Sequence, residues 1–116
     1  CYTGTHDNDT VAGYVQTLAT EDFLLFRSRV AQTLQEEGVY VKLGEHGEGF
    51  PEAFCRLALA SDARLAVLPV QDLLGLGNEA RMNFPGTNEG NWRFRLDRLP
   101  AGVAGKLRHW IKLYRR

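Results

Sequence analysis

The sequence has little cysteine, no excess charge of either sign and no long apolar run, and each shortage excludes a class of protein. Its two cysteines form no CxxC pair, so no disulfide framework is expected, and a reducing, cytoplasmic compartment is favoured. The 14 basic and 14 acidic residues cancel, which argues against an electrostatic surface for nucleic acid or an anionic membrane. No apolar segment approaches the roughly 18 residues of a membrane-spanning helix.

Patterns for a bound metal or nucleotide are also missing. His6, Asp7 and Asp9 are close in the sequence, but no further Cys or His cluster accompanies them and the rest of a calcium loop is absent. The run Gly75 to Ala80 fits the GxGxxA pattern of a dinucleotide-binding turn. It does not directly follow the preceding apolar segment, however, and Pro85 interrupts the crossover that such a motif needs. We therefore expect neither a metal ion nor another cofactor.

The residues that are present favour one folded domain with several helices. Hydrophobic side chains make up 44% of the chain, which suits a core and is too much for a disordered tail. The length suits a single domain over residues 1–116, and no linker marks an internal boundary. Apolar spacing and cap signals predict helices at residues 11–18, 20–37, 51–60 and 102–114, with a shorter helical segment at 70–76.

Short polar residues, glycine and proline mark the ends of these helices. Asp9 or Thr10 can cap the first helix, because a short side-chain oxygen accepts from the free N–H groups of the first turn. We assign that structural role to Asp9. Gly38 stands where a glycine commonly stops a helix such as the second, and Pro51 suits the first turn of the third.

Two short segments read as strands. Cys1–Thr3 is predicted to be the end of one strand, and Leu65–Leu68 is a continuous apolar run, typical of a strand buried on both faces. Trp92–Leu96 is a further candidate for a short extended piece. Helices lie between the two main strands, so parallel pairing through a crossover is expected. The sequence therefore predicts an α/β class.

Two parallel strands cannot cover both faces of a sheet by themselves, which indicates a piece of a larger fold. The chain opens in a strand and its first residue is not methionine, so we expect it to be cut from a longer protein. A (β/α)8 barrel needs about 200 residues or more, and its working residues lie at the C-terminal ends of strands. The pairs His6-Asp7 and Gln71-Asp72 follow the two strands in this way. The pattern allows the last two strands of a barrel without requiring them.

Two blocks of sequence carry a family resemblance. Thr3–Thr10, reading TGTHDNDT, is similar to the late catalytic motif of the 4-alpha-glucanotransferases, also called amylomaltases or disproportionating enzymes. Leu65–Leu96, reading LAVLPVQDLLGLGNEARMNFPGTNEGNWRFRL, resembles that family's last barrel strand and the loop after it. The blocks stand in the family's order, and the resemblance covers essentially the whole chain as the C-terminal end of the enzyme. Tyr14-Val15 and Phe94 are mild departures that affect only details of glucan contact.

The resemblance implies a C-terminal fragment of a (β/α)8 barrel, with its last two strands and flanking helices, that takes part in retaining glycosyl transfer. In such a reaction one carboxylate attacks the anomeric carbon and a second acts as acid and then base. The family adds a third carboxylate beside a histidine, and this pair corresponds to Asp7 and His6. Asp7 would stabilise the transition state, and His6 would bind the same sugar. The nucleophile and the acid/base would lie in the missing N-terminal part of the enzyme, so the fragment alone is expected to be inactive.

Several residues also have ordinary structural interpretations. A His-Asp pair near a helix start is usually structural when it stands alone. Asn83 is the best additional sugar contact, because an amide both donates and accepts, but it can equally brace its own loop. Trp92 is interpreted as a core residue rather than a sugar platform. The remaining charged residues near the loop are predicted to form a partly buried network that holds it, namely Asp72, Glu79 and Arg81.

Two functions remain open from the sequence. The first is part of a 4-alpha-glucanotransferase that moves α-1,4-glucan segments between maltooligosaccharides, with an α-glucan as the substrate partner. The alternative is a non-catalytic glucan-binding or scaffold fragment. The coding sequence upstream of Cys1 separates them, because only the enzyme requires two further strand-end carboxylates there.

Overall fold

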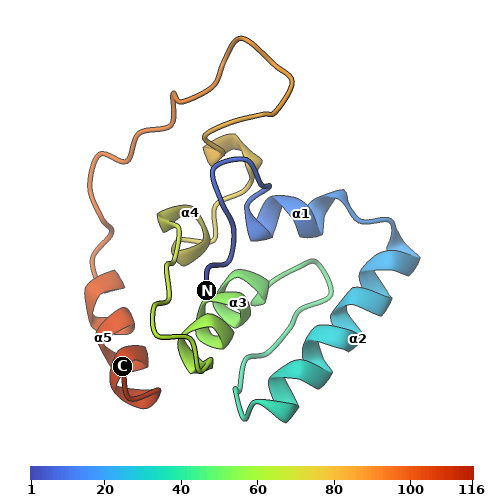
Figure 1. Ribbon diagram of the computed structural model, residues 1–116. Helices are drawn as coiled ribbons and strands as arrows, with labels where there is room; N and C mark the ends of the chain where they lie inside the picture. Colours follow the sequence, from blue (N-terminus) through green and yellow to red (C-terminus); the bar gives the residue numbers. More distant parts are fainter.

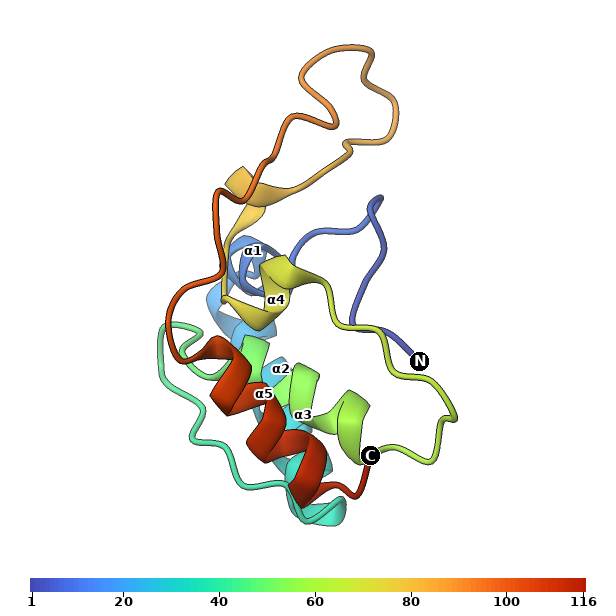
Figure 2. The same ribbon diagram turned by 90° about the vertical axis from the view of Figure 1, so that its left-hand side faces the viewer.

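The computed structural model describes all residues, 1–116, and consists of helices joined by long irregular segments. α3 lies in the middle, with α2 on one side and α5 on the other, and residues 81–102 form a long loop outside the helices (Figures 1 and 2). The regular elements are α1 (Val11–Thr17), α2 (Thr20–Glu36), α3 (Phe50–Ala60), α4 (Val70–Leu73), the short 3-10 helix η1 (Asn78–Ala80) and α5 (Val103–Leu113).

The predicted helices are confirmed, but the cap of α1 is not Asp9. Thr10 is the N-cap, and its Oγ1 accepts from the N–H of Gly13 at 3.0 Å. At the other end of α2, Gly38 has φ +64°, the left-handed conformation that glycine adopts at low cost after a helix. Pro51 lies in the first turn of α3 as expected. No element was predicted at Asn78–Ala80, where the structure has the short helix η1.

α3 has buried side chains on two sides, which is why it lies at the centre. Phe50 and Ala53 belong to one cluster with side chains of α1 and α2, and Phe26 stacks on Phe50 at 5.7 Å between ring centroids. Cys55 belongs to a second cluster that contains Trp110 of α5. Burying an aromatic or aliphatic side chain of this size contributes about 1.5–3 kcal/mol, so both neighbours are held to α3 mainly by apolar packing.

The two predicted strands meet at a single parallel bridge between Tyr2 and Val67. The two predicted strands are therefore parallel neighbours, as expected. The prediction that Leu65–Leu68 is buried on both faces is wrong. Ala66 and Leu68 pack against the cluster of Cys55, whereas Leu65 is 69% exposed and Val67 51% exposed. Successive side chains of extended backbone point to opposite faces, and here only one face is covered. No strand forms at residues 92–96.

A buried carboxylate joins the two strand ends to α1. Asp72 of α4 is only 3% exposed. It accepts from the hydroxyl of Thr3 and, at 2.8 Å, from the N–H of Val11 at the start of α1. The first N–H groups of a helix have no partner within the helix, so this carboxylate satisfies one of them. Asp72 thus fixes how the N-terminal segment lies against α4.

Replacing Asp72 by alanine is expected to lower the free energy of unfolding by about 1–3 kcal/mol, because a buried N–H and a hydroxyl lose their acceptor. Asp72→Asn should cost less, since its amide oxygen can still accept from Val11. The measurement is urea unfolding of the intact protein that contains this chain. The exposed Asp62 supplies the control, and equal effects of Asp62→Ala and Asp72→Ala would contradict the assignment.

Candidate active site

The segments that follow the two bridged residues lie side by side at one end of the molecule. Residues 3–10 run from Tyr2 toward η1 and the start of the long loop (Figures 1 and 2). The N–H of Asn83 donates to the carbonyl of His6 at 3.2 Å. A parallel pair sends both chains to the same edge of a sheet, so the two motifs that sequence analysis singled out are brought into contact.

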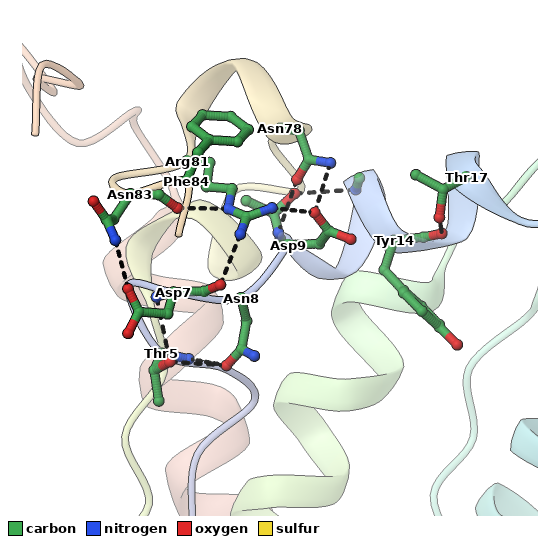
Figure 3. Close-up of polar contacts among 12 residues, drawn as sticks. Thr5, Asp7, Asn8, Asp9, Tyr14, Thr17, Asn78, Arg81, Asn83 and Phe84 are labelled. Carbon is green, nitrogen blue, oxygen red and sulfur yellow. Dashed lines mark hydrogen bonds and ion pairs between the residues drawn. The ribbon is translucent and has the colours of Figure 1, made fainter. Parts of the chain in front are cut away.

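Asp7 is at the centre of this contact. Its Oδ1 accepts from Nδ2 of Asn83 at 2.6 Å (Figure 3). Its Oδ2 lies 3.3 Å from Nε2 of His6. The side chain of Asp7 remains 49% exposed. An ionised carboxylate has about four acceptor sites, so this one is held by two neighbours and still has room for hydroxyl donors from a ligand. The three predicted site residues are therefore together.

A tight turn fixes the backbone that carries Asp7. The side-chain oxygen of Asn8 accepts from both the N–H of Thr5, at 2.7 Å, and its hydroxyl, at 2.9 Å. The N–H of Asn8 in turn donates to the carbonyl of Thr5 at 3.2 Å. Asparagine favours such turns because its short side chain can bond to nearby backbone groups. The turn leaves the Asp7 side chain half exposed and directed toward Asn83 (Figure 3).

The charge network differs from the predicted set. Arg81 pairs with Asp9, which also accepts from Nδ2 of Asn78 at 3.0 Å. Asp72 and Glu79 take no part: Asp72 binds the N-terminal segment, and Glu79 accepts from the N–H of Gly77. Sequence analysis missed the pairing because Asp9 and Arg81 are 72 positions apart, and only the crossover brings them together.

Trp92 is also not where it was predicted. Its side chain is 52% exposed rather than in the core. Its ring centroid lies 5.0 Å from that of His6. The backbone of Trp92 has φ +61°, which is rare for a bulky residue and costs free energy. An exposed indole beside His6 can offer an apolar face to a ligand.

The hollow beside His6 is small and polar. It has a volume of about 220 Å³, and its only apolar side chains are those of Pro69 and Met82. Such a lining suits a hydroxyl-rich ligand better than an apolar one. A larger hollow of about 740 Å³ lies between α2 and residues 39–43, but its mainly apolar lining contains no carboxylate. Of these two hollows, only the polar one has carboxylates in its lining. The lining of the polar hollow consists of Gly4, Thr5, His6, Asn8, Asp9, Thr10, Pro69, Gln71, Asp72 and Met82.

Cys55 is not a candidate nucleophile. Burial, with a smaller effect from the negative charge of Asp72, raises the pKa of its thiol from 9.0 to about 12. Only the thiolate is a strong nucleophile, so at neutral pH this residue serves as apolar packing between α3 and α5.

As for membranes, none of the helices combines enough length with enough apolar character to cross one.

Comparisons with known proteins show which family this chain resembles. A family model described as 4-alpha-glucanotransferase matches residues 1–100. The 4-alpha-glucanotransferase of Thermus thermophilus is 45% identical over 103 residues, which cover 89% of this chain and 19% of the relative. The 4-alpha-glucanotransferase of Synechocystis sp. is 41% identical over 118 residues, which cover 99% of this chain and 21% of that relative. The amylomaltase from Streptococcus agalactiae in complex with acarbose has a TM-score of 0.78 at 26% identity, covering 99% of this chain and 21% of that one.

The chain spans about a fifth of the length of these relatives. Its structure is a portion of the amylomaltase fold, and the matched region contains both motifs that carried the resemblance. The resemblance inferred from residues 3–10 and 65–96 is therefore confirmed. This chain belongs to the 4-alpha-glucanotransferase family.

Proposed function

We propose that this chain is the C-terminal part of a longer 4-alpha-glucanotransferase and forms the last two strands of its (β/α)8 barrel with their flanking helices. The parallel bridge between Tyr2 and Val67 supports neighbouring parallel strands. Helices α1, α2 and α3 lie between them in the sequence, as a crossover requires. The exposed faces of Leu65 and Val67 are then covered by other barrel strands. Free thiols at Cys1 and Cys55 suit a reducing compartment such as the cytoplasm.

The enzyme transfers α-1,4-glucan segments between maltooligosaccharides with retention of configuration. The observation that carries this function is the half-exposed carboxylate of Asp7, held by Asn83 and next to His6 at the end of the parallel pair. The transition state of glycosyl transfer resembles an oxocarbenium ion, and bonds to sugar hydroxyls that tighten there supply several kcal/mol. A fixed carboxylate is a strong acceptor for those hydroxyls. Asp7 is the catalytic residue of this chain.

His6 and Asn83 bind the same sugar beside Asp7. The imidazole of His6 is half exposed and lies beside the indole of Trp92, and it can donate to a hydroxyl. Asn83 donates to Asp7 through Nδ2, so its amide oxygen is the group that accepts from substrate. The nucleophile and the acid/base belong to strands outside this chain. No carboxylate of this chain is assigned to either step.

The test is the product pattern of the intact enzyme with maltotriose as the only substrate. Transfer predicts glucose together with chains longer than maltotriose, because one sugar chain grows as another shrinks. Hydrolysis alone gives only shorter products. Longer products that disappear in a variant lacking the nucleophile support the proposal. Binding of maltooligosaccharides without any product would instead favour the glucan-binding alternative.

A further inference from the structure

We propose that Arg81 is a positioning residue that sets the place of Asp7 relative to Asn83, and so controls turnover without touching substrate. This inference rests on the proposed function of Asp7. It concerns a residue that sequence analysis interpreted only as part of a loop-holding network. All three nitrogen atoms of its guanidinium donate to residues around Asp7.

Arg81 bridges the backbone at both ends of one side-chain hydrogen bond. Its Nη2 donates to the carbonyl of Asp7 at 2.7 Å, and its Nε donates to the carbonyl of Asn83 at 2.7 Å. The side chains of those two residues bond to each other at 2.6 Å. The guanidinium therefore fixes the separation of the two main-chain segments from which the Asp7–Asn83 pair projects (Figure 3).

The third nitrogen anchors the bridge to the body of the fold. Nη1 of Arg81 pairs with Asp9, which is next to the N-cap of α1. Asn78 reinforces this anchor, because it donates to Asp9 and accepts from the N–H of Thr10 at 3.1 Å. The pairing also offsets the charge of Arg81 locally. The guanidinium consequently holds Asp7 through its backbone and does not compete with the sugar for the carboxylate.

Arg81 has little freedom to move. Its side chain is only 13% exposed. The face of Phe84 lies 4.6 Å from the guanidinium carbon, which adds a cation–π contact. Arginine offers donors in a rigid planar fork, whereas lysine has one compact ammonium group on a flexible stem. Lysine can keep the pair with Asp9 but cannot bridge both carbonyls in the same way.

The experiment compares Arg81→Gln and Arg81→Lys in the intact enzyme, with maltotriose as substrate. Misplacing a catalytic group by about 1 Å costs on the order of 10²-fold in rate. We expect Arg81→Gln to lower kcat by about that factor with KM close to the parental value, and Arg81→Lys to lower kcat less. The exposed Arg98 takes part in none of the contacts around Asp7, so Arg98→Gln is the matched control. It should leave kcat unchanged. Thermal melting verifies that each variant is folded.

Combining each Arg81 variant with Asp7→Asn separates positioning from general damage. If Arg81 acts through Asp7, its replacement changes kcat little once the carboxylate is gone, because interacting residues are not additive. The proposal would be overturned if the Arg81 variants lowered kcat by the same factor in the Asp7→Asn enzyme as in the parent enzyme. Parental kcat in both Arg81 variants, together with a lowered kcat in Asp7→Asn, would also overturn the proposal for Arg81. That result would leave the proposed function of Asp7 intact. Parental kcat in Asp7→Asn itself would overturn both the proposed role of Asp7 and that of Arg81.

Discussion

Asp7→Asn in the intact enzyme is expected to lower kcat by on the order of 10³-fold, with KM for maltotriose and the melting temperature nearly unchanged. Several kcal/mol of stabilisation arise only in the transition state, and each 1.36 kcal/mol is worth about tenfold in rate. An interaction confined to the transition state lowers kcat rather than KM. The Asp7 side chain is half exposed, so its charge contributes little to folding.

The structure also removes the main structural alternative for Asp7. Had Asp7 been a helix cap, asparagine would replace it almost without loss, because the two residues cap about equally well. The cap of α1 is Thr10, however, and not Asp7 or Asp9. Asp62→Asn, at an exposed position after α3, is the control for a surface charge change. Turnover of Asp7→Asn near that of the parent would return the His6-Asp7 pair to a structural role.

The isolated 116-residue chain is expected to be catalytically inert and poorly folded. The proposal assigns the nucleophile and the acid/base of the reaction to strands outside this chain. Only 17 of its 116 residues are buried, a small core to set against the conformational entropy lost on folding. Its two extended segments meet at one bridge and leave edges without partners, and such edges favour association between chains.

Two measurements on the purified chain check this expectation. Incubation with maltose or maltotriose should release no glucose above the blank. Amide hydrogen exchange should show weak protection outside α3, since α3 alone has packed neighbours on both sides. Adding the separately expressed remainder of the enzyme should raise protection around residues 65–68. Glucose release by the chain alone, or protection typical of a stable domain throughout, would contradict the account.

The helices were predictable from sequence because their signals are local. Gly38 and Pro51 act through neighbouring backbone groups and keep their predicted roles. The cap of α1, assigned to Asp9, is instead the adjacent Thr10. The pattern of Leu65–Leu68 was misleading. The run is apolar throughout, but this chain covers only one of its two faces. Burial depends on what the whole fold provides, which a run of hydrophobic residues does not reveal.

In the site, too, the local motifs were predictable from the sequence, whereas the contacts between distant residues were not. The motif around His6 and Asp7 was visible in the sequence, and Asn83 was identified as a partner for sugar. That Nδ2 of Asn83 donates to Asp7 could not be read from residues 76 positions apart. The pairing of Arg81 with Asp9 and the exposure of Trp92 were missed for the same reason. Such contacts follow from the crossover topology, which places the ends of distant segments side by side.

The most direct test of the proposed role of Asp7 is a crystal structure of the intact enzyme with a maltooligosaccharide bound. The account predicts that Oδ2 of Asp7 and the imidazole of His6 lie within about 2.5–3.2 Å of hydroxyl groups of one sugar ring. It also predicts that the Asp7–Asn83 hydrogen bond persists and that the reacting bond lies between two carboxylates from other strands. A saccharide bound away from Asp7, with the nucleophile and acid/base complete around it, would contradict the central claim.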